Sequence, residues 1–109
     1  MFSFQQNEYE NAIDLFDQAI RLNPYYASAY NSKAISLDKL KRHEEALVCY
    51  EKALELEPNN TAMLTNKGVC LNNLKRKSEA IECLNKALDF EPQDVDAYLI
   101  KQHLVFTNT

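Results

Sequence analysis

The chain has 109 residues, enough for one domain with an ordinary hydrophobic core. Its 12 Lys and Arg against 16 Asp and Glu give a net charge of -4, which repels a phosphate backbone, so nucleic acid is not expected as a partner. The 3 cysteines have no CxxC spacing, and no apolar run approaches the ~20 residues of a membrane span, so we expect a soluble, cytoplasmic protein in a reducing compartment.

The chain repeats with a period of 34 residues, marked by Pro24, Pro58 and Pro92. Before each proline, Ala and large apolar residues recur at helical spacing, and the single Gly leaves the chain almost without breaks between these boundaries. The pattern predicts an all-α repeat protein. We divide its one domain into a truncated first repeat, two full repeats and a terminal helix or start of a fourth repeat, at residues 1–26, 27–60, 61–94 and 95–109.

In the first repeat, the second helix is expected from about Glu8 to Leu22, because a proline disfavours helical conformation in the residue before it. The first helix of this repeat is reduced to a stub over residues 1–6. Four apolar residues should then lie uncovered and favour self-association: Phe2, Phe4, Ile13 and Phe16.

The two full repeats each predict a pair of helices. Residues 27–40 carry one apolar stripe at spacings of three and four, and a second stripe follows a polar turn and ends at Leu56. The next repeat copies this plan. Small residues stand at equivalent places, Ala34 with Gly68 and Ala46 with Ala80, and we expect the paired helices to approach closely there.

After Pro92, Asp94 is expected to cap a terminal helix from Val95 to about Phe106. Leu99 and Phe106 give this helix an apolar outer face, whereas repeat arrays usually end in a polar one. Either the chain is part of a longer array or its ends contact another molecule. We expect self-association through one of these ends.

The second repeat has the spacing Tyr30-x-x-Lys33-Ala34-x-x-Leu37, Ala46-x-x-x-Tyr50, Ala53, Pro58. This spacing resembles the tetratricopeptide repeat family, and the next repeat fits as well. The resemblance implies a right-handed superhelical solenoid of antiparallel helix pairs. It departs from the family pattern where Lys33 and Lys67 replace an apolar residue and where Lys41 and Lys75 replace the usual turn glycine.

The resemblance also implies that the first helix of each repeat lines a concave groove. The face opposite the packing stripe is therefore the candidate peptide-binding surface, polar with an apolar strip, while the alternative is that these side chains are merely solvated. Its residues are Ser28, Asn31, Ser32, Ile35, Asp38, Thr65, Asn66, Val69, Asn72, Asn73, Ile100 and His103.

Family members that hold the C-terminal carboxylate of chaperones use basic residues and two asparagines on three successive first helices. Here only Asn66 matches, and the basic positions hold Ala62, Asp96 and Ile100. The carboxylate clamp is therefore absent, and a strongly acidic C-terminal ligand is not expected.

Two basic clusters recur at residues 39–43 and 75–77. They could form a cationic docking ridge, but positive charge at the end of a helix more commonly complements the helix dipole, and we favour that reading. His43 and His103 have no Cys or carboxylate at metal spacing, and the three cysteines are read as packed apolar residues. We expect no catalytic residue, no metal and no cofactor in this chain.

The sequence thus predicts a non-catalytic protein interaction module, or scaffold, that binds a peptide or helix of a partner in its groove. The alternative is a structural or assembly segment that self-associates through uncapped ends. Enzymatic activity is expected only from a catalytic domain elsewhere in a longer parent chain.

Overall fold

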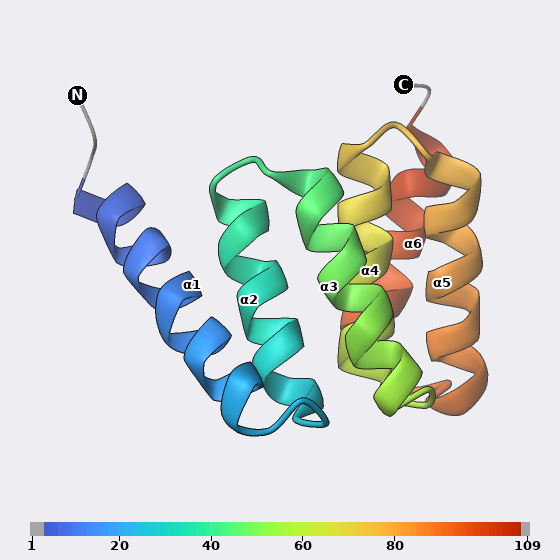
Figure 1. The fold of residues 1–109 in the computed structure, drawn as a ribbon. Coiled ribbons are helices and arrows are strands. Elements are labelled where there is room, and N and C mark those ends of the chain that lie inside the picture. The colour runs from blue at the N-terminus through green and yellow to red at the C-terminus, as the bar shows by residue number, and fades with distance from the viewer. Residues whose placement is uncertain (1–3, 108–109) are drawn as a thin grey trace. The chain divides into compact units, whose positions relative to one another are not determined.

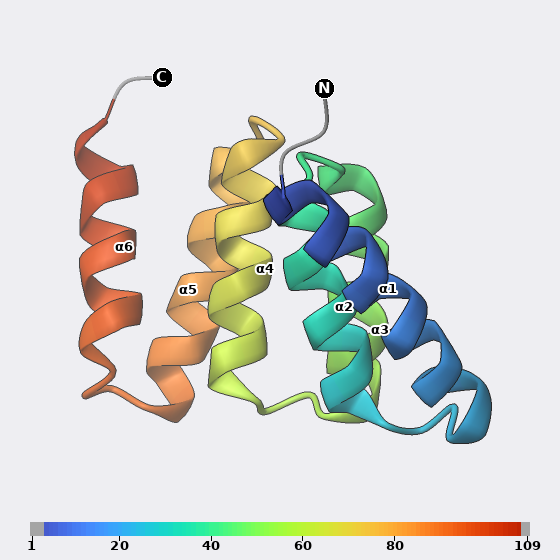
Figure 2. The same cartoon turned by 90° about the vertical axis from the view of Figure 1, so that its left-hand side faces the viewer.

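The computed structural model describes residues 4–107 and contains six α-helices and no strand among them. Figures 1 and 2 show the helices in two views at right angles. Their bounds are α1 Phe4–Leu22, α2 Ala27–Lys39, α3 His43–Leu56, α4 Thr61–Asn73, α5 Lys77–Phe90 and α6 Val95–Phe106. The predicted all-α class is confirmed, and the terminal helix has the expected bounds. No helix among the described residues is both long enough and apolar enough to cross a membrane.

The helices fall into two compact units, residues 1–58 and residues 59–109. In unit 1, α1 packs against α2 and α2 packs against α3 (Figure 1). In unit 2, α4 packs against α5 and α5 packs against α6 (Figure 2). Short turns join α2 to α3 and α4 to α5, so each of these pairs is antiparallel.

Each antiparallel pair turns through a lysine with left-handed backbone conformation. Lys41 and Lys75 both have φ of 65°. The amide of Arg42 donates to the carbonyl of Leu37 at 2.8 Å, and the amide of Lys41 donates to the carbonyl of Asp38 at 2.9 Å. This is the Schellman pattern that commonly closes helices with glycine, and it is repeated in unit 2. The missing turn glycines therefore do not alter the turn.

The small residues predicted at the helix contacts are buried, and at Gly68 the structure shows the predicted close approach of the paired helices. Ala34, Ala46 and Ala80 are fully buried. A Cβ atom added to Gly68 would lie 3.2 Å from the carbonyl oxygen of Ala80 and 3.2 Å from Cγ of Leu84. The glycine thus lets α4 approach the backbone of α5.

The N-terminal expectations need two corrections. Residues 4–6 are not a separate stub but the first residues of α1, since the helical pattern continues through them without a break. Ile13 is only 8% exposed, so it belongs to the core of unit 1 instead of lying uncovered. Phe16 is half-buried. Phe2 and the side chain of Phe4 lie outside the described part of the structure.

Candidate functional site

In unit 1, the candidate binding face lies on α2. Ser28 and Ile35 are exposed, and 36% of the surface of Ile35 is accessible to solvent. Asn31 and Ser32 are half-buried. The carbonyl of Ser32 accepts a hydrogen bond from the hydroxyl of buried Ser36 at 3.2 Å. The face is polar around one apolar side chain, as the sequence predicted.

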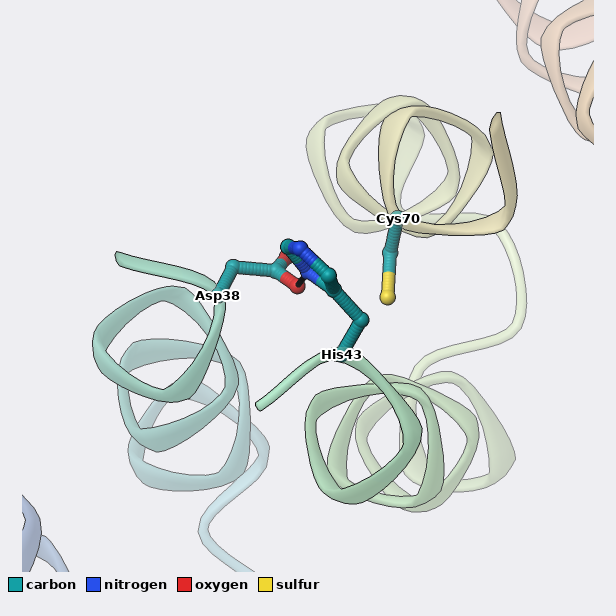
Figure 3. Close-up of side chains that lie close together, drawn as sticks. All are labelled: Asp38, His43 and Cys70. Atoms are coloured by element: carbon teal, nitrogen blue, oxygen red, sulfur yellow. Dashed lines mark hydrogen bonds and ion pairs between the residues drawn. The ribbon is translucent and has the colours of Figure 1, made fainter. Parts of the chain in front are cut away.

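Asp38, which the sequence placed on the same face, is held between α2 and α3. One carboxylate oxygen lies 2.8 Å from Nδ1 of His43, and the other accepts a hydrogen bond from the hydroxyl of Tyr50 at 3.0 Å. Figure 3 shows the imidazole ring and the carboxylate facing one another. His43, for which the sequence offered no carboxylate at metal spacing, begins α3 and lies beside the carboxylate of Asp38. Within unit 1, this cluster joins the two helices.

A pocket of about 320 Å³ lies in unit 1 between α1, α2 and α3. Its apolar lining includes Ile13 and Leu37, and charged side chains complete it. These charges are paired: Lys33 lies 2.7 Å from Asp17, and Arg42 lies 2.6 Å from Glu45. The hydrogen bond to Asp17 raises the pKa of Lys33, and the one to Arg42 lowers the pKa of Glu45. The further lining residues are Val48 and Cys49.

In unit 2, the candidate face on α4 borders a second pocket of about 200 Å³. Thr65 and Asn66 were predicted for the binding face, and both line this pocket. The rest of the lining comes from Thr61 and Ala62 on α4 and from Asp94 and Asp96 at the start of α6. The pocket is therefore polar and carries two carboxylates but no basic side chain.

Three of the positions compared with the carboxylate clamp, Ala62, Asn66 and Asp96, meet in this pocket. The helix starts that form it are capped by side chains. Asn60 accepts a hydrogen bond from the amide of Met63, and Asp94 accepts one from the amide of Ala97, each at 3.1 Å. The cap by Asp94 was predicted from the sequence and is confirmed.

The remaining candidates on α4 and α6 differ in exposure. Val69 is 37% exposed and Asn73 is exposed, whereas Asn72 is half-buried. On α6, Ile100 is half-buried and His103 is exposed. The two residues of α6 that were expected to self-associate are both open to solvent, with Leu99 58% and Phe106 79% exposed.

One arginine in each recurring basic cluster is paired with neighbouring acids. Arg42 lies 3.2 Å from Glu10 on α1, in addition to its pair with Glu45. Arg76 lies 2.6 Å from Glu79, and Lys77 donates to the carbonyl of Thr107. This pairing weakens the interpretation as a docking ridge.

The cysteines are buried to different degrees. Cys49 and Cys70, the latter also drawn in Figure 3, are buried, and Cys83 is half-buried. Burial raises the pKa of the thiols of Cys49 and Cys83, so both resist deprotonation at neutral pH. This agrees with their interpretation as apolar packing residues.

Family models described as tetratricopeptide repeat match residues 27–60 and 62–94, and a second model of the same description matches residues 1–26. No curated protein matches the chain. Many solved structures do match.

One similar structure is the first TPR of Spaghetti (RPAP3) bound to the HSP90 peptide SRMEEVD, with 22% identity, a TM-score of 0.87, and coverage of 94% of this chain and 81% of that one. The TPR domain of Arabidopsis OM64 has 26% identity and a TM-score of 0.84, with 90% and 81% covered. A thermophilic TPR protein of Thermus thermophilus, TTC0263, has 23% identity and a TM-score of 0.85, with 91% of this chain and 50% of that chain covered.

Proposed function

Because the chain belongs to the tetratricopeptide repeat family, we propose that it is a non-catalytic module that binds a peptide or helix of a partner protein on its first helices. In unit 1 the contact surface is the polar face of α2, and in unit 2 it is the face of α4 together with the start of α6. Repeat families of this kind commonly bind partners along the surface that their stacked helices present. The proposed location is the cytoplasm.

The observation that carries this proposal is the pocket beside α4. Thr65 and Asn66, both singled out from the sequence, line this hollow, and the partly exposed Val69 follows one helical turn after Thr65 on α4. An amide side chain both donates and accepts hydrogen bonds, which suits the backbone of an extended peptide, and the apolar neighbour can contact a peptide side chain. A similar fold carries a bound peptide in the RPAP3 structure.

The partner is proposed to be a protein segment without a strongly acidic C-terminus. The positions at which the clamp would place basic side chains hold Ala62, Asp96 and Ile100, and the pocket that Ala62 and Asp96 line bears negative charge. A carboxylate entering this pocket would be repelled. Binding of chaperone tails through a carboxylate clamp is therefore not part of the proposed function, and neither is contact with nucleic acid or membrane.

The test is affinity capture from a lysate followed by mass spectrometry, with the unmodified chain and an Asn31→Ala, Asn66→Ala variant. We expect the same protein to be captured by the unmodified chain in every replicate and lost with the variant. Asn85→Ala is the matched control, because Asn85 is exposed on α5 and lies outside both pockets. Circular dichroism must show that all variants are folded. Equal capture by the double variant would refute the proposed surface.

A second candidate function, self-association through α6, is favoured by the exposure of Leu99 and Phe106. Two large apolar side chains open to water on one helix are typical of a surface that another chain or repeat covers. Light scattering over a concentration series tests it. The mass should rise with concentration for the unmodified chain and stay monomeric for Leu99→Glu with Phe106→Glu. A monomer at all concentrations would exclude this candidate.

A further inference from the structure

The pocket of unit 2 differs in charge from the pocket of unit 1. In unit 1, the carboxylates of Asp17 and Glu45 face Lys33 and Arg42 at ion-pair distance. In unit 2, Asp94 and Asp96 line the pocket, and neither is in an ion pair within residues 4–107. The unit 2 pocket thus carries two carboxylates that no cation of the described chain balances.

The other side chains of this pocket offer hydrogen-bond acceptors. Asn66 contributes an amide, and Thr61 and Thr65 contribute hydroxyl groups. The hydroxyl oxygen of Thr65 is buried and has no hydrogen-bond partner among the described residues. Buried polar atoms are usually satisfied, so the hydrogen-bonding capacity of this hydroxyl is left unused by the described residues.

The position of Asp94 and Asp96 at the start of α6 explains part of the negative charge in this pocket but not all of it. Asp94 caps α6 with one oxygen, and Asp96 lies in the first turn, where acidic residues complement the helix dipole. The starts of α4 and α6 both border the pocket, however, and each dipole contributes only about half a positive charge, so together they offset about one of the two carboxylate charges. The pocket therefore remains favourable to a cation and unfavourable to an anion.

We propose that this pocket recognises the basic side chain, lysine or arginine, of a peptide bound along α4. This inference rests on the proposed function and specifies its ligand. The ammonium or guanidinium group would donate to the carboxylates of Asp94 and Asp96, with the amide of Asn66 beside them. A volume of about 200 Å³ holds several water molecules at about 30 Å³ each, so it admits such a group with part of its aliphatic stem.

The test uses a phage-displayed library of random linear peptides selected on the full chain. We expect the selected peptides to share a lysine or arginine at one position. Synthetic copies should bind the Asp94→Asn, Asp96→Asn variant about tenfold more weakly, because hydrogen bonds to charged groups are lost. Their binding to the unmodified chain should also weaken with added salt. Asparagine caps helices as well as aspartate does, so the variant retains the start of α6.

Asp89→Asn is the matched control, since Asp89 is exposed on α5 and lies outside the pocket, and it should leave affinity unchanged. Acetylating the peptide N-terminus should also leave affinity unchanged. Loss of binding on acetylation would mean that the pocket takes an N-terminal amine, and it would overturn the assignment to a side chain.

Two outcomes separate this inference from the function on which it rests. Peptides that lack a shared basic residue but lose binding with Asn31→Ala, Asn66→Ala would overturn the inference and leave the proposed function standing. If no peptide is selected by the folded chain, the inference is overturned, and the lysate capture alone decides the proposed function.

Discussion

The left-handed lysines at the two helical turns allow a prediction about glycine and alanine variants. The glycine variant should be the more stable of the two at the turns and the less stable of the two inside a helix. Lys41 and Lys75 have φ of 65°, whereas Lys86 lies in the interior of α5. All three are exposed. Replacing each lysine in turn by alanine and by glycine removes the same charge in both cases, so the comparison of the two variants at one site isolates the backbone.

The expected magnitude follows from these dihedral angles. A residue with a Cβ atom pays about 1–2 kcal/mol for left-handed conformation, and glycine pays almost nothing. Glycine loses more chain entropy on folding, and this loss reduces its advantage over alanine by about 0.4–1 kcal/mol. The glycine variant should therefore be more stable than the alanine variant by about 1 kcal/mol at Lys41 and at Lys75. At Lys86, where the backbone is helical, glycine should be less stable than alanine by about 1 kcal/mol.

Urea unfolding followed by circular dichroism measures these differences. The two turns lie in different units, so their effects should add when both are changed. The lysine charge near a helix end contributes about 0.3–1 kcal/mol of its own, and comparing alanine with glycine cancels it. If the glycine variant is less stable than the alanine variant at the turns as well as at Lys86, the assigned turn conformation and the reasoning from it are wrong.

Three further perturbations test the packing, the ion pair and the helix cap. Ala80→Leu should overpack the α4–α5 contact and cost about 1–3 kcal/mol in free energy of unfolding, and an unchanged melting curve would contradict the close approach at this site. The pKa of Lys33 is raised from its ordinary value of 10.5, so its pair with Asp17 stabilises the fold fully below that pH and is lost as the pH rises through the raised pKa. The stability difference between the unmodified chain and Lys33→Met, about 0.2–1 kcal/mol for such a pair, should therefore shrink in alkaline urea titrations, and a constant difference would exclude the ion pair. Asp94→Ala should cost about 1 kcal/mol and Asp94→Asn much less, and equal losses in thermal unfolding would rule out capping by the side-chain oxygen.

Much of the fold followed from local spacing along the chain. Proline prevents helix continuation, so Pro24, Pro58 and Pro92 marked the ends of the helices before them, and apolar residues at spacings of three and four marked the buried stripes. The predicted cap by Asp94 also held, because capping depends only on neighbouring residues.

Other features depended on contacts between helices distant in sequence. Ile13 was expected to be uncovered, but the packing of unit 1 buries it. Asp38 was placed on the face of α2 opposite the packing stripe, and only the position of α3 decides that its carboxylate accepts a hydrogen bond from Tyr50.

The sequence by itself determined the repeat, the helices and the side chains available for binding, because these depend on residue type and short spacing. Only the tertiary structure brought Thr65 and Asp96 into one pocket and left its carboxylates without a partner cation among the described residues. The physical reason is that a charge is balanced by whatever folding places within a few ångströms of it, and residues distant along the chain meet only when helices pack.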